Sequence, residues 1–454
     1  MRQHSPWIPA RLLPSRDLPN ATVLAAGLAI ALLGNVAILL ALPRAHVLLA
    51  LAAGVAAALF LIGRLSWSVA LLAIGAPLLD PITVLLRDEA VLFYVTRLLV
   101  AGGAAWLLFV SPDPIEPLMR LARDRVFQAA VLLGAVLFVR AIDSPAPEYA
   151  RWKMISYAGT NLLLFAGGFL ALAPRTADAP AASDARLRSL LRASLAFAVL
   201  MGCVALLNWP LHFHKYGARL TALGINPVWM ARTMGLGILI AVAFRAEARI
   251  GRAAVVVLSA LLGLVLVLAG SRAPLAGTLL AVALFSLFLY RRRITFARLA
   301  ALASAGIATG GVALIAMPEV LRERFLHPTG ELSAVARMGI ARVVREGFAQ
   351  AGWLGLGTGG FSKMMGLGDR RVYPHNLVAE ITIENGIPGL VALLLFLGLA
   401  FHRGIVGLRK RRAGATPALL MALFIYAVWN AQFSGDITVN EWVWLFAGCL
   451  AARA

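Results

Sequence analysis

The chain has 454 residues, of which 61% are hydrophobic and 14% are charged, and its formal net charge is +21. Soluble domains are closer to half apolar and a quarter charged, so this composition excludes an ordinary soluble fold. The basic residues lie between apolar blocks and do not follow one face. Membrane topology therefore explains the charge, and no nucleic acid is expected as a partner.

The apolar residues fall in blocks about as long as a helix needs to cross a bilayer. Helices satisfy their own backbone polar groups, and the alternating pattern of a β-barrel is missing from the sequence, so we predict an all-α, polytopic transmembrane bundle of about 12–14 spans. In chain order the expected spans cover residues 21–42, 45–63, 65–79, 90–110, 126–142, 154–173, 189–208, 228–244, 253–269, 274–290, 299–316, 387–402, 416–434 and 438–453. The first block is too long for a signal peptide and is expected to be retained.

Four basic connectors orient these spans. They lie at Arg175–Arg192, Arg245–Arg252, Arg291–Arg298 and Arg403–Arg412. Placing all four in the cytoplasm, as the positive-inside rule requires, puts both termini in the cytoplasm. The opposite, periplasmic side then receives residues 143–153, 209–227, 270–273 and 317–387.

We therefore expect a multi-pass protein of a bacterial inner membrane in three parts: an N-terminal bundle over residues 1–316, a periplasmic loop over 317–386 and C-terminal helices over 387–454. Within the loop, the pattern from Glu331 to Ala351 predicts an amphipathic helix, and residues 352–368 are rich in glycine.

Three basic residues on the predicted periplasmic side are candidates for chemistry. They are Arg272 in Gly-Ser-Arg-Ala-Pro, Arg337 on the amphipathic helix and His375 in Tyr-Pro-His-Asn-Leu. Arginine binds phosphate oxygens in a bidentate manner, and histidine accepts a proton near neutral pH, so the set suggests a phosphate-containing ligand beside a general base. The alternatives are a lipid-headgroup anchor for Arg272, a solvated helix face for Arg337 and a turn histidine for His375.

Other polar residues carry weaker signals. Arg97 is the only clear charge inside a predicted span, and we interpret it as one member of a structural pair. Arg322, Arg370 and Arg371 are interpreted as lipid-headgroup anchors. His212 and His214 lack nearby carboxylates, so they are a poor metal site. With no Asp-X-Asp triplet and no Walker motif in the sequence, no metal and no other cofactor is expected, and ATP-driven transport finds no support.

Three motifs follow one another in a fixed order: Gly355-Leu-Gly-Thr-Gly-Gly-Phe361, Pro374-His-Asn376 and Glu384-Asn-Gly-Ile-Pro-Gly-Leu390. Together with Arg337, with Ser271-Arg272 and with Gly224-Ile-Asn226-Pro227, this set resembles the O-antigen ligase and polymerase superfamily over roughly residues 200–400. The chain departs from the family pattern after Arg272, where Ala-Pro stands in place of glycine-like residues.

The resemblance implies a metal-independent, inverting glycosyl transfer at the periplasmic face. The donor would be a glycan on undecaprenyl pyrophosphate, and the acceptor a hydroxyl of lipid A–core. On this reading Arg272 and Arg337 hold the diphosphate, and His375 takes the acceptor proton. Asn376 and Asn226 would contact substrate, and Glu384 would cap the next helix.

Two alternatives stay open at this point. A polymerase would transfer the glycan to a growing chain of repeat units, and the same chemistry on a protein hydroxyl is a further variant. A transporter or flippase for a lipid-linked glycan belongs to a different class, and it would place ionisable residues near the bilayer midplane and show paired halves.

Overall fold

The computed structural model describes residues 69–70, 115–173, 182–212, 219–221, 225–247, 249–290, 319–326, 342, 344–410 and 415–453. Every described residue lies within the compact unit that spans residues 60–454. The described part is helical and contains no strand, so the all-α prediction is confirmed for it.

The helices follow one another with short connections. They are α6 (Ile115–Arg123), α7 (Arg125–Ile142), α8 (Pro147–Ser156), the π-helical turn η4 (Tyr157–Leu162), α9 (Leu163–Leu172), α10 (Ala182–His212), α11 (Pro227–Ala246), α12 (Arg252–Leu268), α13 (Arg272–Tyr290), α15 (Glu319–Leu326), α17 (Phe361–Met364), α18 (Leu377–Arg409), α19 (Ala415–Ala431), the 3-10 turn η6 (Ile437–Val439) and α20 (Trp442–Arg453).

Six of these helical segments are long and apolar enough to cross a membrane: 125–142, 147–172, 183–207, 227–246, 272–290 and 377–409. The shorter apolar helices α12, α19 and α20 coincide with three further predicted spans. The expected spans at 21–42, 45–63, 65–79, 90–110 and 299–316 lie outside the described residues, apart from residues 69 and 70. A polytopic helical bundle is thus the observed fold class.

Local sequence signals explain where several helices begin. Asp124 caps α7 by accepting hydrogen bonds from the amides of Val126 (2.9 Å) and Phe127 (3.1 Å). Pro147 and Pro227 occupy first helical positions, where a missing N–H costs nothing. α18 is not one straight rod, because Gly386 adopts φ 62° and ψ −155° inside it. The kink separates a short first segment, 377–385, from the apolar segment that follows.

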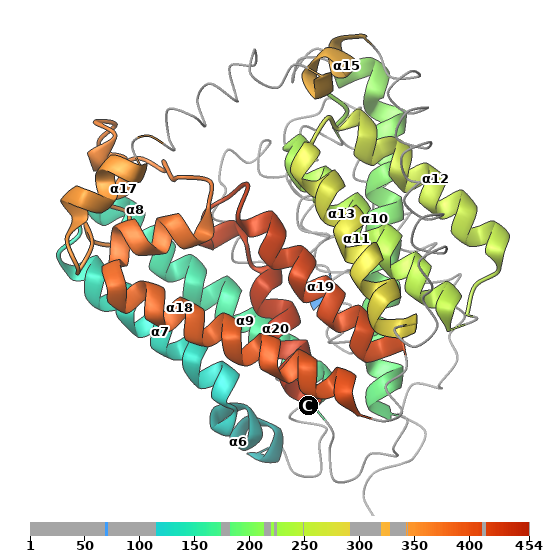
Figure 1. Cartoon of the computed structure of the whole chain (residues 1–454), viewed down its shortest axis with the longest axis horizontal. Helices are drawn as coiled ribbons and strands as arrows, with labels where there is room; N and C mark the ends of the chain where they lie inside the picture. Colours follow the sequence, from blue (N-terminus) through green and yellow to red (C-terminus); the bar gives the residue numbers. More distant parts are fainter. Residues whose placement is uncertain are drawn as a thin grey trace, which may run out of the picture. The chain divides into compact units, whose positions relative to one another are not determined.

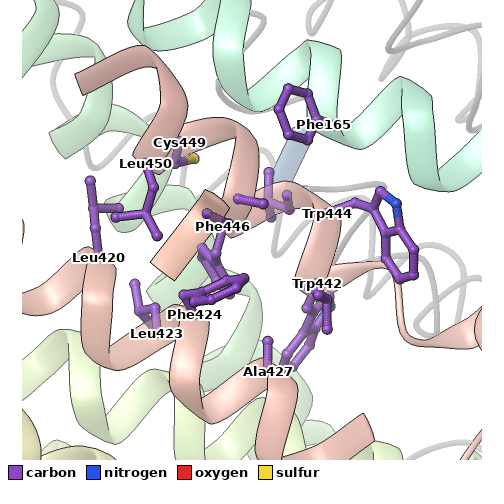
Figure 2. Packing of buried hydrophobic residues seen from close by; sticks show 14 of the residues in the cluster. Phe165, Leu420, Leu423, Phe424, Ala427, Trp442, Trp444, Phe446, Cys449 and Leu450 are labelled. Atoms are coloured by element: carbon purple, nitrogen blue, oxygen red, sulfur yellow. The ribbon is translucent and has the colours of Figure 1, made fainter. Parts of the chain in front are cut away.

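The main hydrophobic core lies between α7, α9, α18, α19 and α20. Figure 1 shows α7 and α18 running side by side, and Figure 2 shows side chains of α9, α19 and α20 meeting, among them Phe165, Phe424 and Trp444. The ring of Trp444 stacks on Phe396 of α18 at 5.4 Å. Large apolar side chains also point outward from α7, α12 and α18, as expected for surfaces that contact lipid.

Ion pairs and hydrogen bonds between connectors show which of the described loops lie at the same end of the helical bundle. We call one the Asp124 end, where Arg403 pairs with Asp124 at 3.0 Å, Arg453 pairs with Asp184, and Thr416 contacts Glu247. We call the other the His375 end. It comprises residues 143–149, 219–221, 225–226, 269–273, 353–376 and 432–441, which are linked by the hydrogen bonds described below. Within the loops predicted to be periplasmic, residues 143–149, 219–221, 225–226, 270–273 and 353–376 fall at the His375 end.

Candidate active site

The segment before α18 contains Pro374, His375 and Asn376, and it lies against the end of α19. The Asn376 side chain caps α18, because its Oδ1 accepts a hydrogen bond from the Ala379 amide at 2.8 Å. Its Nδ2 donates to the carbonyl oxygen of Gln432 at 3.1 Å. Asn376 therefore ties the first turn of α18 to the segment that leaves α19, and its predicted contact with substrate stays a prediction.

His375 has φ 59° and is the one residue other than glycine with a positive φ in the described part of the chain. A side chain in this left-handed region costs about 1–3 kcal/mol, and such residues gather at functional sites. The half-buried imidazole ring lies edge-on to Tyr373, with 4.6 Å between ring centroids. The backbone at His375 thus has a conformation that residues other than glycine rarely adopt.

Arg371 anchors the same segment to the connector between α19 and α20. Its Nε and Nη2 donate to the two carboxylate oxygens of Asp436, both at 3.3 Å, and Nη2 also donates to Thr438 at 3.1 Å. Our interpretation of Arg371 as a headgroup anchor missed this pair, because its partner lies 65 positions away.

Opposing effects set the ionisation of this pair. Burial disfavours the charge on Asp436, but the positive charges of Arg371 and Lys153 and the hydrogen bonds from Thr438 and Arg371 outweigh it, so the pKa of Asp436 is below its ordinary value. For Arg371, burial lowers the pKa, but the charge and hydrogen bonds of Asp436, together with smaller contributions from Tyr373 and Tyr149, raise it above its ordinary value. Burial also raises the pKa of Tyr373, as does the charge of Asp436. Asp436 and Arg371 are both charged at neutral pH.

Arg272 is the first residue of α13, and this end of α13 is attached to α19. The carbonyl oxygen of Ala273 accepts a hydrogen bond from Nε1 of Trp429 at 2.9 Å, and Ser271 accepts one from Arg219 at 2.6 Å. Trp429 precedes Gln432, the partner of Asn376, by less than one helical turn. The structure therefore brings the Arg272 and His375 segments to the same end of α19.

Of the two remaining predicted site residues, Arg337 and Asn226, the structure describes only Asn226. Arg337 lies outside the described residues, as do residues 331–341 of its predicted helix, whereas residues 344–351 are helical. Asn226 caps α11, with its Oδ1 accepting from the Val228 amide at 2.9 Å. A contact between Asn226 and substrate remains a prediction.

Arg232 of α11 is a functional candidate that we missed. It is 3% exposed and donates hydrogen bonds to Asn440 Oδ1 (3.0 Å) and to the carbonyl oxygens of Asn430 (2.6 Å) and Ser434 (2.8 Å). Our interpretation of Arg97 as the only clear charge inside a span is therefore wrong, since Arg232 lies within 228–244. The signal was present in the sequence, because an arginine within an apolar span is costly unless it is paired.

The glycine-rich motif packs against the kink of α18. The amides of Leu356 and Gly357 donate to the carbonyl oxygens of Ile383 (2.9 Å) and Glu384 (2.8 Å), and the Ile387 amide donates to Trp353 at 2.8 Å. A Cβ on Gly355 would lie 2.5 Å from the Gly386 nitrogen. The glycines of these two motifs thus permit close backbone packing.

The expectation that Glu384 caps a helix is wrong. Glu384 lies inside α18, is 1% exposed, and pairs with Lys153 at 2.7 Å. Lys153 also pairs with the buried Glu380 at 2.6 Å. Among the described residues no group of three His, Cys, Asp or Glu side chains is arranged to hold a metal ion.

These features define a class: a polytopic helical membrane protein with a half-buried histidine, arginines and a buried acid gathered at one end of its bundle. Residues 254–394 match the family model described as O-antigen ligase, and this match supports the resemblance to the O-antigen ligase and polymerase superfamily. The matched range contains Arg272, Arg337 and His375 but not α8, Arg232 or Asp436. No curated protein matches the chain.

Proposed function

We propose that this protein is a metal-independent, inverting glycosyltransferase. It would move a glycan from undecaprenyl pyrophosphate to a hydroxyl of lipid A–core at the periplasmic face of the inner membrane. The observation that carries the proposal is His375: an imidazole held in a costly backbone conformation, within a segment that matches the O-antigen ligase family. The proposal also draws on the arginines near it, because a diphosphate needs charge compensation at a membrane surface.

In the proposed step the acceptor oxygen attacks the anomeric carbon from the face opposite the diphosphate. A bond forms between that oxygen and the anomeric carbon, and the bond from the anomeric carbon to the diphosphate oxygen breaks. His375 takes the proton of the acceptor hydroxyl, and the lipid diphosphate leaves with the bonding electrons. Arg272 and Arg337 stabilise the charge that develops on the leaving group.

The test uses the purified full-length protein with a lipid-linked glycan donor and lipid A–core. We expect His375→Ala to reduce the rate of transfer by about a hundredfold or more, which is the usual contribution of a general base. Arg272→Ala should also lower the rate. Arg370→Ala is the matched control, because Arg370 is an exposed arginine on the same segment. We expect transfer by the wild-type protein to persist in excess chelator.

Transfer at wild-type rates by His375→Ala would contradict the assignment of the base. The polysaccharide profile of a deletion strain separates the two acceptors. Loss of all long chains with accumulation of lipid-linked polymer indicates a ligase, whereas caps of a single repeat unit indicate a polymerase. Movement of the donor across vesicles without any transfer would favour the flippase alternative.

A further inference from the structure

A buried cluster of charges lies next to the candidate active site and has no place in the chemistry proposed above. Lys153 of α8 is fully buried, and its Nζ donates to Glu380 Oε1 at 2.6 Å and to Glu384 at 2.8 and 2.7 Å. Both glutamates belong to the first segment of α18, and each is at most 1% exposed. The three side chains form one closed contact between α8 and α18.

Stability alone is a poor explanation for this cluster. Removing three charged groups from water costs several kcal/mol for each ion, and well-packed apolar residues of similar size are often as stable or more so. A buried ionic cluster is better explained where it fixes one particular geometry. The remaining hydrogen bonds of the two carboxylates identify the segments it fixes.

Each glutamate has an oxygen that reaches a different loop of the His375 end. Oε2 of Glu384 accepts a hydrogen bond from the Gly359 amide in the glycine-rich motif at 2.8 Å. Oε2 of Glu380 accepts one from the Ile437 amide, in the connector between α19 and α20, at 3.0 Å. Lys153 therefore orients two carboxylates that hold two loops in place.

α8 also contacts the segment 369–376 directly. The carboxylate of Asp369 accepts hydrogen bonds from the amides of Glu148 (2.8 Å) and Tyr149 (3.0 Å) in the first turn of α8. The Tyr149 hydroxyl donates to Asp436 Oδ2 at 2.7 Å, and Asp436 pairs with Arg371. The segment 369–376 is thus tied to α8 at two points: directly at Asp369, and through Asp436 at Arg371.

The same cluster lies close to the C-terminal end of the segment 369–376, just after His375. The Glu380 amide donates to the carbonyl oxygen of Asn376 at 2.9 Å, so Glu380 lies one helical turn beyond the cap of α18. Fixing the Glu380 side chain on Lys153 therefore fixes the rotation of the turn that presents His375.

We propose that α8 is the positioning element of the transfer reaction. Lys153 acts through Glu380 and Glu384, and Tyr149 acts through Asp436, so that the segment 369–376 holds the His375 imidazole toward the acceptor hydroxyl. Both are positioning residues that touch no reacting atom. The effect on catalysis in this inference rests on the proposed function. The positioning of segment 369–376 by α8 can be tested without measuring activity.

The first test compares two buried tyrosines of the same helical segment. Tyr149→Phe removes the hydrogen bond to Asp436, whereas Tyr157→Phe removes one to the carbonyl oxygen of Ala130 and one from Nε1 of Trp444, both away from the active site. Each variant loses one buried hydroxyl, so similar losses of stability are expected. We expect Tyr149→Phe to lower kcat about tenfold, which corresponds to about 1.4 kcal/mol in the barrier. It should leave KM for the donor within about twofold and shift the pH profile of kcat/KM.

Tyr157→Phe should keep the kcat and pH profile of the wild-type protein. Equal kcat values and pH profiles for the two variants would overturn the proposal, even if Tyr149→Phe unfolded more readily, because a purely structural role predicts that result.

The second test neutralises the whole cluster. Lys153→Met alone would leave two buried carboxylates without their cation and is expected to reduce the yield of folded protein. The triple variant Lys153→Met, Glu380→Gln, Glu384→Gln removes all three charges and keeps the side-chain sizes. We expect its folded fraction to have lower kcat and unchanged donor KM. Wild-type kcat in that fraction would refute the role of the cluster, and if no folded protein is obtained, the tyrosine pair decides.

A third measurement does not depend on transferase activity. Hydrogen exchange of the backbone amides of residues 371–373, 375 and 376 is compared in the wild-type, Tyr149→Phe and Tyr157→Phe proteins. Faster exchange in Tyr149→Phe alone supports positioning by α8, and equal exchange in the two variants refutes it. A wild-type protein that transfers no glycan but shows this difference would overturn the proposed function and leave the role of α8 in place.

Discussion

Asp436 is a fully buried carboxylate whose charge depends on its neighbours. It accepts hydrogen bonds from the Tyr149 hydroxyl, from Thr438 and from Arg371. These contacts and the charges of Arg371 and Lys153 hold its pKa below the ordinary value of 3.8 despite its burial. A carboxyl group whose pKa is lower in the folded than in the unfolded chain stabilises the folded state above its ordinary pKa. That contribution is lost as the pH falls through the lowered pKa.

The Asp436→Asn variant tests this assignment. It leaves Arg371 without its anionic partner, and because Arg371 is partly exposed we expect the free energy of unfolding near neutral pH to fall by only about 1–3 kcal/mol. The acid sensitivity should change as well: as the pH falls below about 4, the wild-type protein should lose stability more steeply than the variant does.

Thermal unfolding in detergent across this pH range measures both effects. Asp143→Asn is the control, since it removes an exposed carboxylate at the same end of the bundle. Identical acid slopes for wild type and Asp436→Asn would show that this carboxyl does not titrate with unfolding.

At the scale of elements, the contact between the glycine-rich motif and α18 has little room for a side chain. Gly355 has φ 82°, and an added Cβ would lie 2.5 Å from the backbone nitrogen of Gly386. Gly352 has φ 62°, but a Cβ there would meet nothing within 4 Å. Both positions have a positive φ that favours glycine, but only at Gly355 would an added Cβ clash with neighbouring atoms.

Alanine at these two positions therefore separates strain from packing. Gly352→Ala should cost about 1–2 kcal/mol for the left-handed backbone alone. Gly355→Ala should cost more, because the motif must also move away from α18, and transfer activity should fall with it. Melting temperatures and transfer rates of the two purified variants are the measurements, and equal losses would show that close packing contributes nothing.

The sequence predicted apolar helices well and buried polar contacts poorly. The observed α7, α11, α12 and α13 begin and end within a few residues of the predicted spans, since hydropathy over some twenty residues is a local property. Lys153 was assigned to a connector, residues 143–153, but it is buried in α8. A hydropathy pattern treats a lysine as unfavourable inside the bundle. It does not indicate that two carboxylates, 227 and 231 positions away in the sequence, compensate the charge of Lys153.

For the candidate site as well, the sequence indicated some residues and missed others. The motifs identified His375 and Arg272 because they lie within the range that matches the family model. Asp436 and Arg232 lie outside that range, and their importance depends on contacts with the connector between α19 and α20. Such contacts join residues from distant parts of the chain, so no local pattern indicates them.

At the scale of the whole molecule, the ion pairs and hydrogen bonds divide the loops of the described part between two ends of the bundle. Arg403, Arg453 and Glu247 lie at the Asp124 end, whereas His375, Asp436 and Arg272 lie at the other. Asp184, Glu247 and Arg403 belong to three of the four predicted arginine-rich connectors, so these connectors lie at the Asp124 end where they are described. The positive-inside rule predicts that the Asp124 end faces the cytoplasm, which would place the His375 end in the periplasm, as the proposed reaction requires.

Two lysines of matched exposure test this orientation. Lys363 is exposed at the His375 end, and Lys410 is exposed just after α18, near the opposite end. In a variant that lacks Cys203 and Cys449, we expect Lys363→Cys to react with a membrane-impermeant maleimide in cells whose outer membrane has been permeabilised. Lys410→Cys should react only after the inner membrane is opened. The reverse pattern would place the candidate site in the cytoplasm, and a periplasmic transfer reaction would then be impossible for this protein.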